Sequence, residues 1–450
     1  MRVHFIAIGG SAMHNLAIAL HEKGFQVTGS DDEIFEPSRS RLLKHGLLPK
    51  TMGWQPELIT PELDAIILGM HARKDNPELL RAQELGLKVY SYPEYLYEQT
   101  KEKTRVVIGG SHGKTTITSM IMHVLKTLEV DFDYMVGAQI EGFDTMVRLT
   151  VEAPIAIFEG DEYLSSPIDL TPKFHWYKPH IALLSGIAWD HINVFPTWDN
   201  YVEQFAIFAR SIEPGGKLIY FEGDENLAAI AQSILQAQTL AYKGLPARNE
   251  DGTTIVEQAG KAYPLMVFGD HNLQNIEGAM LVCQQLGIKP EDFLTAIISF
   301  KGAAKRLQVL KKKDQSTIFL DFAHSPSKLK ATTTAVKKQF PNRKLVACME
   351  LHTFSSLNKD FLPEYHKAMQ EADEAIVFFN PEVVKHKKLP PFEKSDVEKA
   401  FDQDNLTVFT ESAALVTHLK SHQWQNTNLL IMTSGNLSGV DLAALANELI

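Results

Sequence analysis

The residues best suited to chemistry form the run Gly109-Gly110-Ser111-His112-Gly113-Lys114-Thr115-Thr116. A phosphate chain needs backbone N–H donors, a helix N-terminus and a cation, and glycines let the backbone turn around it. The run lies between an apolar stretch and an amphipathic one, which predicts a strand, a loop and a helix in this order. Lys114 would reach the β- and γ-phosphates, and the Thr115 hydroxyl would bind Mg²⁺. The usual spacing has a glycine where Ile108 stands, so the alternative is a structural glycine turn with an incidental lysine.

Two clusters of metal-binding residue types follow later apolar stretches. Glu159, Asp161 and Glu162 stand together, and three carboxylates at the end of a strand repel one another without a cation. Glu159 is therefore the best candidate for a Mg²⁺ ligand, and the alternative is a solvated acidic turn. His191 follows Asp190, and a neutral imidazole can bind a metal while the neighbouring carboxylate orients it. Taken alone, His191 is equally compatible with a structural or surface histidine.

Three polar clusters lie further along the chain. Asn272 and Asn275 stand one helical turn apart at the start of a predicted helix, and their amides suit the edge of a purine. The alternative is that Asn272 caps the helix. The clusters Lys301–Arg306 and Leu320–Pro326 are each compatible with a solvated cation pair or a helix cap when taken alone.

The N-terminal turn Ala7-Ile8-Gly9-Gly10-Ser11-Ala12 is a degraded form of the dinucleotide-binding fingerprint, with alanine at its outer glycine positions. Asp31 falls about 20 residues further on, where a ribose-binding carboxylate is expected. The turn could hold NAD or another diphosphate nucleotide.

The elements that must position these residues alternate between strands and helices, which is typical of doubly wound parallel sheets. The α/β pattern restarts twice and predicts three domains, over residues 1–100, 101–302 and 303–450. The polar run Glu98–Thr104 is interpreted as the first linker. A hairpin is predicted around Asn249–Gly252.

Composition narrows the class of protein. The 450 residues carry 44 Lys and Arg against 55 Asp and Glu, a net charge of −11, which argues against nucleic-acid or anionic-membrane binding. Cys283 and Cys348 lie in apolar stretches and are expected to be buried, reduced thiols. No signal peptide or membrane span is evident, so a cytoplasmic protein with no obligate protein partner is expected.

The motifs taken in order resemble those of the Mur ligases, the ATP-dependent amide-forming ligases of peptidoglycan synthesis. The resemblance covers almost the whole chain and rests on HFIAIGGSAM, GGSHGKTT, FEGDE, WDH, GDHNLQN, KRL and DFAHSP. It implies a Rossmann-like UDP-binding domain, a P-loop ATPase central domain and a Rossmann-like C-terminal domain. The departures are Ser325 where a second histidine is common, Ala7 and Ala12 in the first turn, and the loop TSGNLSG.

The resemblance also implies roles for the candidate residues. Lys114, Glu159 and His191 would be catalytic, and Thr115, Glu159 and His191 would bind Mg²⁺. The ATP site would comprise Gly110, Ser111, His112, Gly113, Lys114, Thr115, Thr116, Asn272, Asn275, Arg306, Asp321 and His324. The UDP site would comprise Gly9, Gly10, Ser11, Asp31 and His71. The C-terminal domain would read the amino substrate, with His352, Thr353, Ser355 and Asn436 as loop candidates.

Within this family the sequence is most similar to the branch that starts from UDP-N-acetylmuramate. The forms DFAHSP, ELHTFSS and TSGNLSG resemble the recycling ligase, which adds the tripeptide L-Ala-γ-D-Glu-meso-diaminopimelate. The alternative is addition of L-alanine in biosynthesis. A non-enzymatic or NAD-dependent protein would leave the P-loop unexplained, and a folylpolyglutamate-type synthase would lack the UDP domain.

Overall fold

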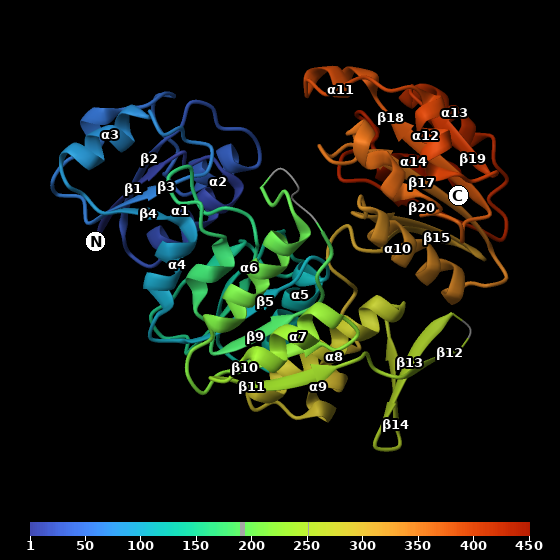
Figure 1. The fold of residues 1–450 in the computed structure, drawn as a ribbon, viewed down its shortest axis with the longest axis horizontal. Coiled ribbons are helices and arrows are strands. Elements are labelled where there is room, and N and C mark those ends of the chain that lie inside the picture. Colours follow the sequence, from blue (N-terminus) through green and yellow to red (C-terminus); the bar gives the residue numbers. More distant parts are fainter. Residues whose placement is uncertain (190–193, 251) are drawn as a thin grey trace. The chain divides into compact units, whose positions relative to one another are not determined.

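The structure is a computed structural model that describes residues 1–189, 194–250 and 252–450. The chain forms two compact units (Figure 1). The first comprises Met1–Lys243 and Asn275–Ala296, and the second comprises Gly244–Gln274 and Ile297–Ile450. Of the four sheets in the described part of the chain, three are wholly or mainly parallel, which confirms the predicted α/β class.

The first sheet is parallel throughout, with strand order β2-β1-β3-β4. Its strands are β1 (Arg2–Ile6), β2 (Gln26–Ser30), β3 (Ala65–Leu68) and β4 (Val89–Ser91). Its helices are α1 (Ser11–Glu22), α2 (Ser38–Lys44), α3 (Pro77–Glu84) and α4 (Tyr92–Thr100). Successive residues of β1 pack on opposite faces: Phe5 joins a core with Leu16 of α1, and Ile6 joins another with Leu79 of α3.

The linker predicted over Glu98–Thr104 is wrong. Helix α4 runs to Thr100, and strand β5 (Thr104–Gly109) begins four residues later. Arg105 is 1% exposed, and its guanidinium donates to the carbonyl oxygens of Thr100, Lys101 and Lys103 at 3.2, 2.7 and 3.3 Å. This buried arginine fixes the connection, so a polar sequence forms an ordered junction.

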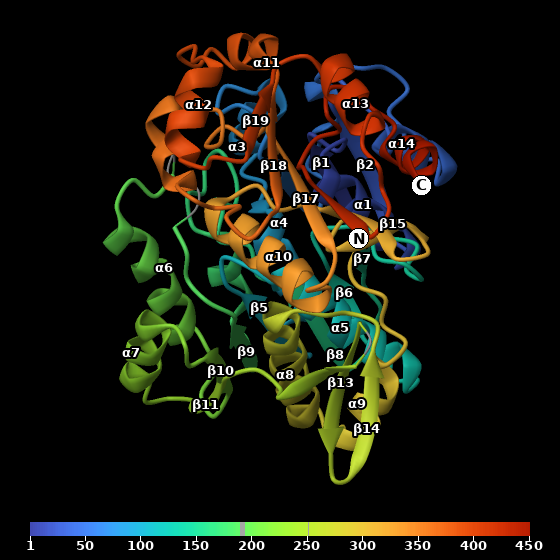
Figure 2. The ribbon, with the colours of Figure 1, turned by 90° about the vertical axis from the view of Figure 1, so that its right-hand side faces the viewer.

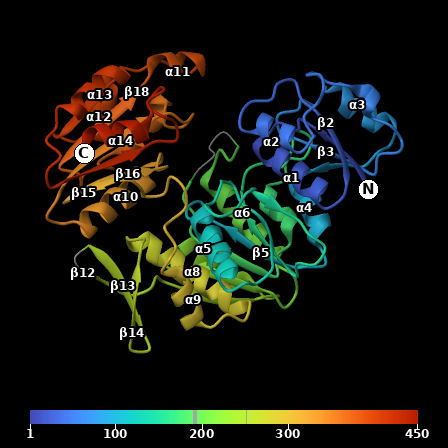
Figure 3. The ribbon, with the colours of Figure 1, turned by 180° about the vertical axis from the view of Figure 1, so that it is seen from behind.

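The central sheet has strand order β11-β10-β9-β5-β8-β6-β7, and only β7 is antiparallel to its neighbour. Its other strands are β6 (Asp133–Met135), β7 (Val147–Arg148), β8 (Ile155–Glu159), β9 (Ile181–Leu184), β10 (Lys217–Phe221) and β11 (Gln238–Tyr242). Its helices are α5 (Lys114–Thr127), α6 (Trp198–Arg210) and α7 (Glu225–Ser233). Phe158 and Leu184 belong to the same buried cluster as Phe205 and Phe208 of α6. Helix α5, labelled in the rear view of Figure 3, contacts β8.

The second unit begins with an antiparallel sheet of β12 (Ala247–Glu250), β13 (Thr253–Gln258) and β14 (Lys261–Leu265). Glu250 pairs with Thr253, which confirms the predicted hairpin, although Asp251 at its tip lies outside the described residues. Helix α8 (Asp270–Gln285) begins in this unit and ends in the first, and α9 (Pro290–Ile297) follows it.

The last sheet has strand order β15-β16-β20-β17-β18-β19, parallel except at β15. Its strands are β15 (Gln308–Lys313), β16 (Ser316–Asp321), β17 (Lys344–Leu351), β18 (Glu374–Phe379), β19 (Leu406–Phe409) and β20 (Thr427–Met432). Its helices are α10 (Pro326–Gln339), α11 (Pro381–His386), α12 (Lys394–Phe401), α13 (Ser412–Lys420) and α14 (Leu442–Leu449). Leu345 and Ala347 pack with α10 and α12, whereas Val346 and Cys348 pack with α13 and α14 on the other face (Figure 2).

Both cysteines are buried free thiols, as predicted. Among the described residues, no helix combines the length and the apolar character needed to cross a membrane.

Candidate active site

The glycine-rich run forms the predicted loop between a strand and a helix. Strand β5 ends at Gly109, and α5 begins at Lys114. Gly110 and Gly113 have φ angles of 126° and 80°, which side chains rarely allow. A Cβ on Gly110 would lie 2.2 Å from Ser185 Oγ. The first turn of α5 therefore opens onto a loop with the features of a phosphate-binding cradle.

Lys114 is held at the centre of this cradle. Its Nζ donates to the Gly110 carbonyl at 2.6 Å and to Glu162 Oε2 at 2.7 Å. Burial opposes the charge on Lys114, but Glu162 and Asp161 raise its pKa above the ordinary value. The Tyr201 hydroxyl lies 3.0 Å from Glu162 Oε1 and 2.8 Å from Ser111 Oγ. Tyr201 thus links the glycine-rich loop, through Ser111, to Glu162, the carboxylate that pairs with Lys114.

The three neighbouring carboxylates are separated by their partners. Asp161 pairs with Lys173 at 2.5 Å, and Glu162 pairs with Lys114. Burial opposes ionisation of Asp161, but the ammonium groups of Lys173 and Lys114 lower its pKa to about 2. Lysine ammonium groups thus supply the positive charge expected beside two of the three carboxylates, Asp161 and Glu162.

Glu159 has a different set of partners. Its Oε1 accepts from Thr115 Oγ1 at 2.8 Å, and its Oε2 accepts from the Gly137 N–H at 2.9 Å. Burial raises the pKa of Glu159 despite these bonds and the nearby Lys114 charge. The Thr115 hydroxyl and the Glu159 carboxylate therefore converge, and both are oxygen donors of the kind that Mg²⁺ prefers.

These groups open into a pocket of about 330 Å³. It is lined by Ser11, Ala12, Tyr92, Lys114, Met135, Val136, Gly137, Met146, Val147, Glu159, Asp161 and Lys173. Ser11 comes from the N-terminal glycine turn, and Lys114 comes from the phosphate loop. Two sequence motifs a hundred residues apart thus face one cavity within the first unit.

The predicted UDP-site residues share one edge of the first sheet. Gly9, Gly10 and Ser11 follow β1, Asp31 follows β2, and His71 lies exposed three residues after β3. The Gly9 N–H donates to Asp31 Oδ2 at 2.7 Å. Asp31 thus shapes the glycine turn, and Ala7 beside it has a φ of 67°, a conformation that glycine adopts at lower cost.

Asp31 carries an expectation about pH. Burial raises its pKa to about 6, so the folded state holds its proton more tightly than the unfolded chain. Its contribution to stability is fully present below about pH 4 and is lost as the pH rises through 6. We expect the unfolding temperature of Asp31→Asn, relative to wild type, to increase between pH 4.5 and 7.5, measured by thermal scans. A pH-independent difference would contradict this, and exposed Asp404→Asn is the control.

The two predicted asparagines of α8 belong to different units of the chain. Asn275 belongs to the first, where its amide packs so closely on the phosphate loop that a Cβ on Gly113 would lie 2.6 Å from its Oδ1. Asn272 belongs to the second, where its amide donates to the Phe268 carbonyl at 2.8 Å. Asn272 lies inside the helix, so the alternative that it caps the helix is wrong.

Three further predicted residues lie in the second unit, and two of them contact one aromatic ring. The Arg306 guanidinium lies 4.7 Å from the centre of the Phe322 ring, and the His324 ring meets the same ring edge-on at 5.4 Å. Asp321 accepts from the backbone N–H groups of Leu307 and Ala323, both at 2.7 Å. Burial raises the pKa of Asp321, although Arg306 acts against this.

The remaining phosphate-loop residues serve partly to hold the loop. The Ser111 hydroxyl accepts from the Ala188 N–H at 2.9 Å, the His112 carbonyl accepts from Ser185 Oγ, and Thr116 is buried in α5. Ser111 thus anchors the segment that leads toward His191. His191 itself lies outside the described residues.

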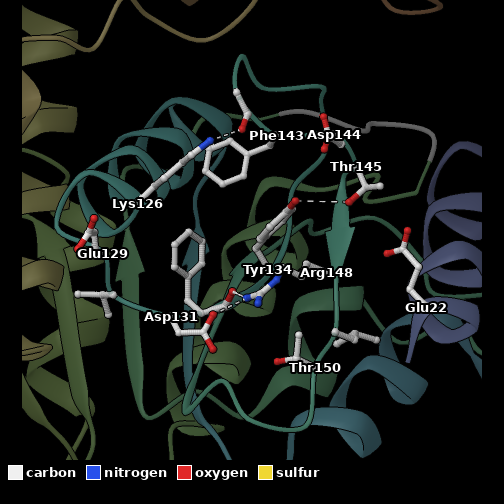
Figure 4. Close-up of a pocket in the computed structure, with 14 residues that line it drawn as sticks. Glu22, Lys126, Glu129, Asp131, Tyr134, Phe143, Asp144, Thr145, Arg148 and Thr150 are labelled. Carbon is white, nitrogen blue, oxygen red and sulfur yellow. Dashed lines mark hydrogen bonds and ion pairs between the residues drawn. The ribbon is translucent and has the colours of Figure 1, made fainter. Parts of the chain in front are cut away.

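A larger hollow of about 560 Å³ lies elsewhere in the first unit (Figure 4). Its two cationic side chains bond within its own wall: Arg148 pairs with Asp131 at 2.8 Å, and Lys126 donates to the Gly142 carbonyl. Tyr134 and Phe143 line it, and their rings meet edge to face with their centres 5.3 Å apart. It contains none of the predicted site residues.

Sequence reasoning missed several residues of the candidate site. Lys173, Tyr92 and Gly137 line the pocket and Tyr201 contacts Glu162, but all four come from segments without a recognisable motif. Glu162 was seen only as one member of an acidic run. A conserved pattern around Lys173 could have identified it, but a single sequence carries no such signal.

The lysine of the glycine-rich loop pairs with one member of a carboxylate cluster, and its pocket is also lined by a second glycine turn. Together with successive α/β domains, these features are typical of nucleotide-dependent enzymes. The comparison with known families specifies the class further. The Mur ligase family catalytic domain matches residues 2–104, the Mur ligase middle domain matches 108–283, and the Mur ligase glutamate ligase domain matches 305–436. The chain belongs to the Mur ligase family, and it is an ATP-dependent ligase that forms a C–N bond in peptidoglycan synthesis.

Individual relatives agree with this family. The chain is 27% identical over 387 residues to a UDP-N-acetylmuramate–L-alanine ligase of Limosilactobacillus reuteri, covering 83% of this chain and 84% of the relative. A ligase of the same name from Sulfurihydrogenibium is 29% identical over 385 residues, covering 84% and 82%. Solved structures share the fold: a murein peptide ligase of Psychrobacter arcticus has a TM-score of 0.66 at 22% identity, covering 99% of both chains. The UDP-N-acetylmuramate–alanine ligase of Thermotoga maritima has a TM-score of 0.71 at 20% identity, covering 100% and 98%.

Proposed function

We propose that this ligase joins UDP-N-acetylmuramate to L-Ala-γ-D-Glu-meso-diaminopimelate, in recycling of peptidoglycan. The observation that carries the choice of amine is the form of the C-terminal loops, DFAHSP, ELHTFSS and TSGNLSG. The last two are joined in the structure, because buried Glu350 accepts from the Leu437 N–H at 3.0 Å and from the Thr433 hydroxyl. L-Alanine is the second candidate, because the curated relatives reported above carry that activity in their names.

The reaction must activate a poor electrophile. The lactyl carboxylate of the muramate would attack the γ-phosphorus of ATP, which releases ADP and gives an acyl phosphate. The free amine of the peptide would then attack the acyl carbon, and the tetrahedral intermediate would lose phosphate to leave the amide. The pocket provides the means to bring two anions together, because Lys114 and Lys173 place two ammonium groups at its wall.

The residues divide among the substrates as follows. Gly110, Ser111, His112, Gly113, Lys114, Thr115 and Thr116 would hold the phosphates of ATP, Asn272 and Asn275 the adenine, and Arg306, Asp321 and His324 would complete the nucleotide site. Gly9, Gly10, Ser11, Asp31 and His71 would hold UDP. Thr115, Glu159 and His191 would bind Mg²⁺, which neutralises phosphate charge when bound. The convergence of Thr115 Oγ1 and Glu159 Oε1 at 2.8 Å supports this ligand set.

The deciding measurement is phosphate release from ATP with UDP-N-acetylmuramate present. We expect strong turnover with the tripeptide and turnover lower by at least about a hundredfold with L-alanine, because a loop set built for a peptide leaves its polar groups unpaired on the smaller amine. Strong turnover with L-alanine would establish the second candidate instead. Turnover with neither amine would refute the assignment of UDP-N-acetylmuramate as the carboxylate substrate, whichever amine is used.

A further inference from the structure

Two histidines and a glutamate converge on the last sheet, and none of them belongs to the candidate sites described above. Glu374 is the first residue of β18, His418 lies in the last turn of α13, and His422 follows that helix by two residues. His418 Nε2 lies 3.0 Å from Glu374 Oε1, and His422 Nε2 lies 2.9 Å from Glu374 Oε2. Among the residues that the structure describes, no other three His, Cys, Asp or Glu side chains bring their ligand atoms within 4.8 Å of one another.

The position of this cluster separates it from substrate chemistry. Strands β16, β17, β18 and β20 are parallel, and Asp321–His324 follows the carboxyl end of β16. Glu374 stands at the amino end of β18. The cluster therefore lies at the opposite edge of the sheet from the loops assigned to the nucleotide and the amine.

The hydrogen bonds of His422 show which of its nitrogens is available. Its Nδ1 lies 2.9 Å from the His418 carbonyl oxygen, which can only accept, so Nδ1 carries the proton. In the neutral ring Nε2 then has a lone pair, and it faces a carboxylate oxygen that also has only lone pairs. A positive charge must stand between them, either as a second proton on the ring or as a metal ion. A backbone acceptor on the far nitrogen is also the usual support of a metal-binding histidine.

The ligands are held by rigid neighbours but stay accessible. The His422 ring stacks on Trp424 at 5.2 Å, and Trp424 Nε1 donates to the Leu419 carbonyl at 3.1 Å. The His418 ring contacts Phe409 at 5.1 Å. The side chains of His418, His422 and Glu374 are 31%, 17% and 30% exposed, so one side of the cluster is open to solvent.

We propose that Glu374, His418 and His422 form a Zn²⁺ site with water as the fourth ligand. Two imidazoles and one carboxylate are a ligand set that favours Zn²⁺ over Mg²⁺ or Ca²⁺. Bonds of about 2.0–2.2 Å to a tetrahedral ion separate the ligand atoms by roughly 3.3–3.6 Å. One ligand atom from each of the three residues already lies within 4.8 Å of the others, so adjustment of the side chains is enough to reach this spacing. The ion would tie α13 to the start of β18.

The test is Zn²⁺ binding by the full chain, titrated against a chromogenic chelator with Mg²⁺ in millimolar excess to occupy sites built for hard cations. We expect wild type to bind one more Zn²⁺ than His422→Gln or His418→Asn, whose affinity at this site should fall at least about a hundredfold. Zn²⁺ should raise the unfolding temperature of wild type but not of these variants. His386→Gln, an exposed histidine on α11, is the matched control and should bind like wild type.

Equal zinc uptake by wild type and the two variants would overturn the proposal, as would no uptake by wild type. If the variants fail to fold, the zinc X-ray absorption spectrum of wild type decides. Two imidazole ligands would support the site, because the proposed catalytic metal site offers only one histidine. A spectrum with fewer than two would overturn it.

Discussion

Replacing Lys114 with alanine is expected to lower phosphate release by at least about a thousandfold, with UDP-N-acetylmuramate, ATP and the amine all saturating. The ammonium group lies at the N-terminus of α5 with its Nζ 2.7 Å from a carboxylate and 2.6 Å from a loop carbonyl, so it is fixed before any phosphate arrives. Fixed charges aimed at a transferring phosphoryl group stabilise its transition state more than its ground state. The effect should therefore fall on kcat more than on KM.

The same substitution also changes stability, and the two effects must be separated. Glu162 has a side chain only 1% exposed, and in Lys114→Ala its carboxylate stays buried without the ammonium counter-charge. Losing one partner of a buried pair costs roughly 3–5 kcal/mol. The double variant Lys114→Ala with Glu162→Gln should recover most of the lost unfolding temperature and none of the activity. Near-normal turnover in the single variant, or restored turnover in the double, would refute the phosphate role.

The parts of the fold that the sequence predicts well are those with an apolar strand and a clear break. The sequence predicts strands over Gln26–Ser30, Ile155–Glu159, Lys217–Phe221 and Glu374–Phe379. Strands β2, β8, β10 and β18 have these bounds, because each is a short apolar or alternating run that ends at a turn or helix start. β6 and β7 were missed because they span three and two residues. Asp133 in β6 is fully buried and pairs with Lys103 at 2.6 Å, so a polar residue occupies a core position there.

The sequence also predicts some parts of the candidate site well and misses others. Contiguous motifs such as Gly109–Thr116 are visible in the sequence because one loop carries all their chemistry. Partners on different segments are not: Lys114 and Glu162 are 48 residues apart, and nothing in their spacing indicates an ion pair. The acidic run could be identified as a cluster, but only the fold shows that Asp161 and Glu162 face lysines while Glu159 faces a hydroxyl.

Replacing Glu159 with glutamine is expected to lower kcat by about a hundred- to a thousandfold and to raise the Mg²⁺ concentration needed for half-maximal turnover. Each carboxylate oxygen accepts one bond, from Thr115 Oγ1 at 2.8 Å and from the Gly137 N–H at 2.9 Å. Glutamine can still accept from the Gly137 N–H and can donate its NH₂ group to Thr115 Oγ1, so the contacts of this side chain are kept while its negative charge is lost. Phosphate release over a Mg²⁺ titration measures the effect.

Binding of ADP separates a Mg²⁺ ligand from a residue that only supports the loop. If Glu159 helps to hold Mg²⁺, calorimetry should show that Mg²⁺ tightens ADP binding to wild type but not to Glu159→Gln, while ADP alone binds both equally. A collapsed phosphate loop would instead weaken ADP binding with and without the cation. Glu152→Gln, an exposed glutamate just before β8, is the matched control and should behave as wild type. A Glu159→Gln enzyme with unchanged Mg²⁺ dependence would remove Glu159 from the ligand set and leave Thr115 to coordinate without its neighbouring carboxylate.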